Sequence, residues 1–112
     1  SQPENAALVK RWMKLLGVEE LVDQPFRNTS TGMQRICLLI RALVKNPALL
    51  ILDEPCQGLD MQQQEHFKQV LNELCRNSNL SMIYVSHYER EIPDCVKNIL
   101  VLKQGKSITK AE

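Results

Sequence analysis

The spacing of hydrophobic residues in the first part of the chain predicts two main helices. Between residues 4 and 16 the apolar side chains recur near one face, and Gly17 follows as a residue that can end a helix. A second amphipathic helix is expected from Gly32 to about Lys45, because isoleucine, leucine and valine recur there at spacings of three and four. Pro47 then stops the helix, since proline cannot continue one.

The pattern in the middle of the chain predicts a strand, a helix and a second strand. Residues 49–52 are all apolar, which predicts a strand buried on both faces. Residues 61–76 have a helical stripe of apolar side chains, and Asp60 with Gln63 three positions later forms the pattern of a capping box. Residues 82–85 form the next apolar run. Together these segments predict a parallel βαβ unit.

The end of the chain, at residues 99–102 and 107–109, predicts a hairpin around a turn that contains glycine. The composition changes near Pro47, from helical before it to mixed helix and strand after it. We therefore expect an α/β fold with one helical segment, residues 1–46, and one α/β segment, residues 47–112. A short helix at residues 19–22 is also expected.

Charge and composition exclude several classes of protein. The formal net charge of the 112 residues is +1, with lysine and arginine scattered, so neither a nucleic-acid footprint nor a polybasic membrane anchor is present. No apolar run exceeds five residues, far short of a membrane span. The four cysteines form no closely spaced pair, and we read them as reduced thiols of a cytoplasmic protein.

Two carboxylates, Asp53 and Glu54, directly follow the first predicted strand. Ligands bind at the carboxyl edge of open parallel sheets, where one carboxylate can hold Mg²⁺ and the other can polarise a water molecule. His87 follows the next strand, so it should lie at the same edge, near both carboxylates. The alternative interpretation is that the strands simply end in polar surface residues.

Ser30, Thr31 and Gly32 stand at the start of the second long helix. The free N–H groups and the dipole at such a start favour a phosphate. The alternative interpretation is that Ser30 only caps the helix.

Four motifs occur in order, and together they resemble the ABC-type ATPases over nearly the whole chain. They are Thr29 to Met33 in place of the signature sequence Leu-Ser-Gly-Gly-Gln, Leu49 to Glu54 as the Walker B strand, Gly58 to Asp60 as the D-loop, and His87 as the switch histidine. A narrower resemblance extends to the tandem ATPases associated with molybdate transport or photorepair. The resemblance implies a P-loop NTPase-like fold, here a piece of the helical subdomain followed by part of the ATPase core.

The resemblance also implies roles for these residues in ATP hydrolysis with Mg²⁺. Asp53 would hold Mg²⁺, Glu54 and His87 would be catalytic, and Asp60 would couple two sites. The signature would bind the γ-phosphate held by a second ATPase domain, in a homodimer or a tandem protein. The residues expected to bind nucleotide through the signature and D-loop are Ser30, Thr31, Gly32, Met33, Gln34 and Asp60. A membrane permease at the inner face of the cell membrane is a further expected partner, and direct nucleic-acid binding is not expected.

The chain departs from the family pattern in two respects. It contains no Gly-x-x-x-x-Gly-Lys-[Ser/Thr] phosphate loop, so we expect a fragment that is inactive alone. The signature is also altered, because Thr31 replaces its first glycine and Met33 its glutamine. We therefore hypothesise an asymmetric dimer in which this signature serves the weaker site.

Three functions remain open from the sequence. The first is an energy-coupling ATPase for transport of a solute, with molybdate as one candidate. The second is a soluble ABC ATPase that acts on nucleic acid or the ribosome. The third is a non-catalytic interaction module that retains the same scaffold.

Overall fold

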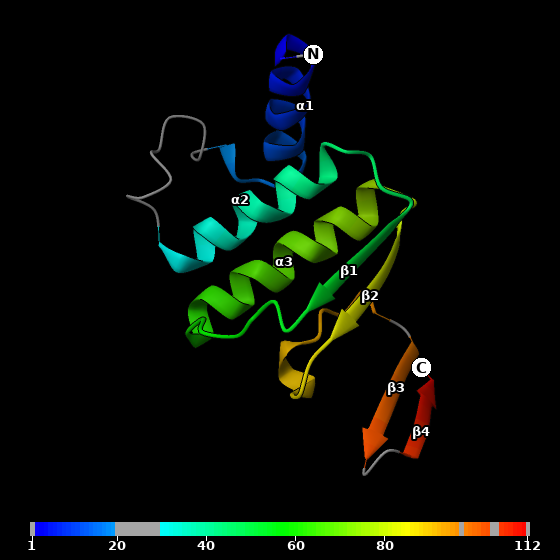
Figure 1. Ribbon diagram of the computed structural model, residues 1–112. Coiled ribbons are helices and arrows are strands. Elements are labelled where there is room, and N and C mark those ends of the chain that lie inside the picture. Colours follow the sequence, from blue (N-terminus) through cyan, green and yellow to red (C-terminus); the bar gives the residue numbers. More distant parts are fainter. Residues whose placement is uncertain (1, 20–29, 97, 104–105, 112) are drawn as a thin grey trace.

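The computed structural model describes residues 2–19, 30–96, 98–103 and 106–111 (Figure 1). In chain order the elements are α1 (Gln2–Leu15), α2 (Thr31–Leu43), β1 (Leu49–Asp53), α3 (Met61–Asn77), β2 (Ser81–Val85), the 3₁₀ turn η3 (Glu89–Glu91), β3 (Asn98–Lys103) and β4 (Lys106–Ala111). Most of the predicted helix at residues 19–22, and the first signature residue, Thr29, lie outside the described residues.

Helix α1 ends where the sequence predicts, at a glycine in the left-handed region. Gly17 has φ +73°, and its N–H donates to the carbonyl of Lys14 at 3.2 Å. The N–H of Val18 donates to the carbonyl of Met13 at 2.8 Å. This pair of bonds is a Schellman motif, which satisfies the last carbonyls of the helix. Val18 and Met13 are both buried, so the end of α1 is anchored in the core.

Strands β1 and β2 pair in parallel, as predicted, and α3 connects them. Leu50 is buried, and the neighbouring side chains on the same face pack against the helices. The prediction that the first strand is buried on both faces is wrong. The side chains of the other face alternate with the inner ones and are 43–60% exposed: Leu49, Ile51, Ile83 and Val85. Among the described residues, helices cover only the inner face, and a continuous apolar run cannot reveal this difference.

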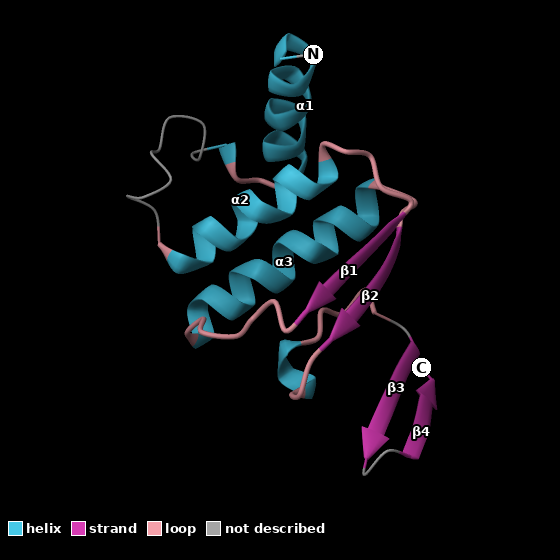
Figure 2. Ribbon diagram, viewed as in Figure 1, coloured by secondary structure: helices cyan, strands magenta, loops and turns pink. Residues whose placement is uncertain are grey.

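The three helices and the inner face of the β1–β2 sheet enclose one core. Helix α3 lies between α2 and the strands, and α1 packs against both α2 and α3 (Figure 2). The largest fully buried side chains of the core include Phe67, Ile36, Leu43, Leu71 and Leu74. The predicted terminal hairpin is confirmed as the antiparallel pair β3–β4, which forms a separate sheet. None of the described helices is long and apolar enough to cross a membrane.

Candidate functional site

The carboxyl edge of the parallel sheet holds the two adjacent carboxylates. Asp53 is the last residue of β1, is exposed, and lies opposite Val85 in the register. Glu54 continues the pairing by one residue, since its N–H donates to the carbonyl of Val85 at 2.8 Å. Glu54 has φ +51°, a left-handed conformation that is uncommon outside glycine. The chain therefore turns sharply at Glu54 and leaves its carboxylate at the edge of the sheet.

His87 lies against Glu54, as expected from the order of the strands. Its Nε2 is 2.9 Å from Oε1 of Glu54. The imidazole side chain is 81% exposed, whereas the Glu54 side chain is 21% exposed. The pair therefore combines a partly sheltered carboxylate with a ring that is open to solvent. Such a pair can position a water molecule and accept a proton from it.

The backbone after β2 is held by a serine turn. The hydroxyl of Ser86 accepts a hydrogen bond from the N–H of Tyr88 at 3.1 Å and donates to the carbonyl of the same residue at 3.1 Å. His87 lies inside this turn, so the turn limits where its side chain can reach.

Tyr84, on β2, ties the turns that follow the two strands to each other. Its hydroxyl donates to the carbonyl of Glu91, at the end of η3, and lies 3.3 Å from Sγ of Cys56, which follows β1. Burial raises the pKa of the phenol, as do the hydrogen bond and charge of Cys56, so the hydroxyl keeps the proton that it donates. The segments that carry Glu54 and His87 are therefore joined beneath the site.

Arg35, on α2, clamps the turn that contains Glu54. Its guanidinium donates to the carbonyl of Pro55 and, at 3.0 Å, to the carbonyl of Gln57. Within the turn, the N–H of Gln57 donates to the carbonyl of Glu54 at 3.1 Å. The sequence carries no signal for the role of Arg35, because no local pattern indicates a contact across 20 to 22 residues.

Four of the five residues predicted to form the altered signature, Ser30 to Met33, lie at the N-terminus of α2. Ser30 is the N-cap, and its hydroxyl accepts a hydrogen bond from the N–H of Met33 at 3.2 Å. Ser30 therefore caps the helix, a feature that both interpretations of this residue share. Thr31 is exposed beside it, and Met33 and Gln34 are half-buried.

Gly32 is buried where α2 approaches α3. A Cβ at this position would lie 3.1 Å from Cγ of Gln63 and 3.2 Å from its Cβ, closer than side chains normally pack. Gln63 is also part of the predicted capping box, which is confirmed. The N–H of Gln63 donates to Oδ1 of Asp60 at 2.8 Å, and the N–H of Asp60 donates to Oε1 of Gln63 at 3.1 Å. The signature glycine therefore packs on the residue that fixes Asp60.

The carboxylates at the sheet edge suit a magnesium ion that is shared with a phosphate ligand. Among the described residues, no group of three or more histidine, cysteine, aspartate or glutamate side chains could hold a metal. Proteins usually bind Mg²⁺ through one or two carboxylates, with water and substrate phosphates completing the shell. Asp53, exposed at the strand end, provides a donor of this kind.

Comparison with known proteins places this arrangement in a family. The family model described as ABC transporter matches residues 2–57. The chain belongs to the ABC transporter family. Its sequence is 39% identical to the ABC transporter ATP-binding protein ModF of Escherichia coli, over 83% of this chain and 19% of that protein. It is 34% identical to the zinc import ATP-binding protein ZnuC of Halorhodospira halophila, over 86% of this chain and 38% of that protein.

Solved structures from the ABC family share the fold. The structure of cbiO1 from Clostridium perfringens, part of the ABC transporter complex cbiONQ, has a TM-score of 0.83 and 30% sequence identity. That match covers 96% of this chain and 43% of cbiO1. The ATP-binding cassette MJ1267 in its ADP conformation has a TM-score of 0.80 at 19% identity. The expected fold, a partial ABC ATPase domain, is confirmed. The chain spans about a fifth of the length of ModF.

The structure brings the predicted site residues together in two groups. Glu54 and His87 meet at the sheet edge, with Asp53 adjacent in the chain. The second group, at the starts of α2 and α3, contains Ser30, Thr31, Gly32, Met33, Gln34 and Asp60. Arg35 connects the two groups through the Glu54 turn.

Proposed function

We propose that this ABC family chain supplies the water-activating edge and the signature helix of an ATPase. The observation that supports the proposal most directly is the 2.9 Å contact between Glu54 and His87 at the carboxyl edge of a parallel sheet. Asp53 would hold Mg²⁺ there. When bound, this ion would neutralise charge on the phosphates of ATP.

The chemistry assigned to the chain's own residues is a proton transfer from water. Glu54 orients the attacking water molecule and accepts its proton, because its carboxylate is partly sheltered and fixed by the turn. His87 orients Glu54 through their contact and reaches the γ-phosphate from its exposed side. The phosphate loop that holds ATP comes from residues other than these 112, so the 112 residues alone are expected to be inactive.

The signature helix acts on ATP held by a second ABC ATPase domain, in a homodimer or a tandem protein. Ser30 and the first N–H groups of α2 face the γ-phosphate there, and the neighbouring residues Thr31, Gly32, Met33 and Gln34 shape this surface. Asp60 couples the two sites. In this proposal residues 1–46 belong to the helical subdomain and residues 47–112 to the ATPase core.

The cellular role that we propose is to power transport of a solute through a membrane permease, from the cytoplasmic side. Two curated relatives of this chain are named for ion import, of zinc and of Fe(3+). Molybdate is a candidate substrate on the narrower resemblance of the sequence.

The test is Glu54→Gln in the full-length protein, with Glu65→Gln as a matched control on the exposed side of α3. Removal of a general base lowers turnover by roughly 10²- to 10⁴-fold. We expect a loss in this range, with ATP binding retained, measured by phosphate release and by equilibrium binding. The control should hydrolyse ATP normally.

Two outcomes would count against the proposal. Normal turnover by the Glu54→Gln variant would remove the general-base role. A wild-type full-length protein that binds no ATP would instead identify a non-catalytic interaction module.

A further inference from the structure

Two cysteines that are distant in the sequence meet on one side of α3. Cys95 follows η3, and its backbone N–H donates to Oδ1 of Asn72 at 3.0 Å. Its thiol donates to the carbonyl of Leu71 at 3.7 Å. In an α-helix, a carbonyl lies next to the residue four positions later. The thiol of Cys95 therefore lies at the turn of α3 that carries Cys75.

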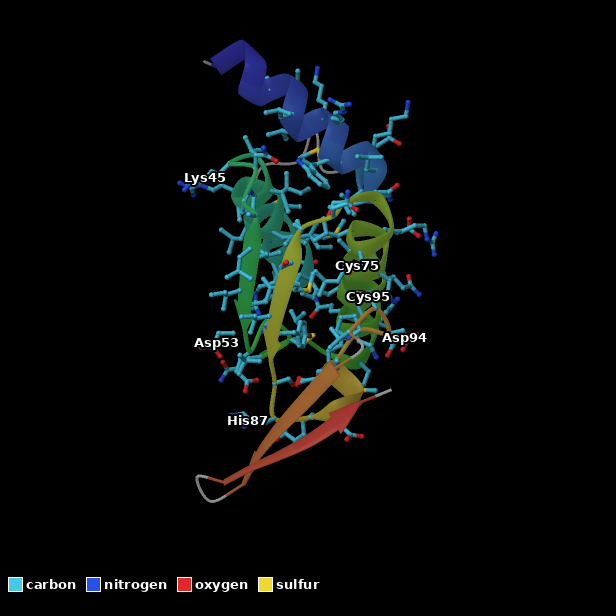
Figure 3. The ribbon with its side chains drawn as sticks, turned by 90° about the vertical axis from the view of Figure 1, so that its right-hand side faces the viewer. Lys45, Asp53, Cys75, His87, Asp94 and Cys95 are labelled. Atoms are coloured by element: carbon cyan, nitrogen blue, oxygen red, sulfur yellow. The ribbon has the colours of Figure 1, made fainter. Side chains whose placement is uncertain are left out.

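The two thiols lie near each other on the side of α3 and face an open cavity. Both are half-buried and line one open cavity of about 760 Å³ beside α3 and β2. Figure 3 shows Cys75 and Cys95 next to each other, with Asp94 nearby. Cys95 lies outside the helices and strands, so bond formation at its sulfur breaks no helical or strand hydrogen bond.

The surroundings of Cys95 determine the order of any reaction at this pair. Burial, followed by the hydrogen bond and charge of Cys75, raises the pKa of the Cys95 thiol to about 12. At neutral pH Cys95 therefore remains a thiol, whereas thiolates are the attacking species in disulfide exchange. Cys95 therefore suits the second, resolving step of an exchange.

We propose that Cys75 and Cys95 form a reversible disulfide by exchange with a small-molecule disulfide, such as glutathione disulfide. The Cys75 thiolate attacks one sulfur of glutathione disulfide, which forms a mixed disulfide and releases one glutathione thiolate. The Cys95 sulfur, after loss of its proton to solvent, then attacks the sulfur of Cys75. The second glutathione leaves, so the two protein thiols are oxidised and one glutathione disulfide is reduced to two glutathione molecules.

The bond would join α3 to the segment after η3 and close a loop that contains β2 and His87. A disulfide that closes a loop stabilises the native state mainly by restricting the unfolded chain. The modification would therefore raise the melting temperature and fix the segment that carries His87. This property is separate from the proposed ATPase activity and does not depend on it.

The experiment treats the native full-length protein with glutathione disulfide, blocks free thiols, and identifies cross-linked peptides by mass spectrometry. We expect a peptide pair joined through Cys75 and Cys95, reversed by dithiothreitol, together with a higher melting temperature. Cys75→Ser and Cys95→Ser should each abolish the cross-linked peptide pair and the rise in melting temperature. Cys37→Ser, a half-buried cysteine on α2, is the matched control and should leave it unchanged.

The pH dependence gives a second readout, of the ring-closing step. Ring closure should become faster as the pH rises from 7 to 9, because the raised pKa of Cys95 limits its thiolate fraction. Cys95→Ser should leave a stable glutathione adduct on Cys75. Wild-type protein that accumulates glutathione on both cysteines without cross-linking, or that reacts at neither, would overturn the proposal.

Discussion

The starts of α2 and α3 lie against each other but are held in different ways. At the start of α3, Asp60 and Gln63 exchange two hydrogen bonds, at 2.8 and 3.1 Å. At the start of α2, Ser30 accepts a single bond from Met33 at 3.2 Å. The two starts touch where Gly32 packs on Gln63.

The difference is one hydrogen bond, which fixes the start of α3 more firmly than the start of α2. The capping box uses both the side chain and the backbone of Asp60, so the start of α3 is fixed internally. The first two N–H groups of each helix have no acceptor within the helix; in α2 they belong to Thr31 and Gly32. An anion can therefore bind at α2, while α3 supplies a rigid surface behind it.

Among the substitutions that test this comparison, the largest effect is expected from breaking the link between α2 and the Glu54 turn. Arg35→Met removes both hydrogen bonds to the turn, to Pro55 and to Gln57. A misplaced catalytic group can cost about 100-fold in rate. If the proposed function holds, we expect a fall of about this size in the kcat for ATP hydrolysis by the full-length protein, with the KM for ATP little changed.

The matched control for Arg35 is Arg41→Met, an exposed arginine in the last turn of the same helix. Arg35→Lys should recover part of the loss, since one ammonium can serve one of the two carbonyls. Equal kcat values for the Arg35 and Arg41 variants would show that the clamp does not position Glu54.

A smaller effect is expected from restoring the altered signature. The double substitution Thr31→Gly with Met33→Gln removes a Cβ and adds an amide that can donate to a phosphate. One hydrogen bond to a charged group changes a rate by about tenfold or more. We expect turnover of the full-length protein to rise by about this factor. The control is Met61→Gln, an exposed methionine at the start of α3. Unchanged turnover would contradict the hypothesis of a weaker site.

The smallest effects are expected from substitutions that remove each helix cap in turn, which compares the two caps directly. Asp60→Ala removes the acceptor of a reciprocal box, and Ser30→Ala removes a single acceptor. N-cap substitutions cost roughly 0.5 to 2 kcal/mol, so we expect about 1 kcal/mol or more for Asp60 and about 0.5 kcal/mol for Ser30. Urea unfolding of the full-length protein measures both values. A larger loss of unfolding free energy in Ser30→Ala than in Asp60→Ala would show that the start of α3 is not the more firmly capped of the two.

Local signals in the sequence were enough to predict the elements and the caps. The Asp60–Gln63 box, the end of α1 at Gly17 and the terminal hairpin depend on neighbouring residues, and all three are confirmed. The contact of Glu54 with His87 was also predictable, because parallel strands end at one edge. The catalytic roles of both residues remain predictions.

Features that depend on distant segments could not be predicted in the same way. The Arg35 clamp and the meeting of Cys75 with Cys95 each join residues about 20 positions apart, and no spacing rule indicates them. The exposure of Ile51, at 60%, depends on what covers the outer face of the sheet rather than on the strand itself. The left-handed backbone conformation of Glu54 could not be predicted from its residue type, because glutamate seldom adopts this conformation.

The backbone of Glu54 has an evolutionary consequence. A left-handed conformation costs a residue with a Cβ roughly 1 to 2 kcal/mol relative to glycine. Selection for stability alone would therefore favour glycine at this position, and Glu54 persists against that pressure only where its carboxylate is useful. Replacement of Glu54 by glycine would relieve this strain, whereas replacement by glutamine or alanine would remove the carboxylate and keep the strain, because both residues retain a Cβ.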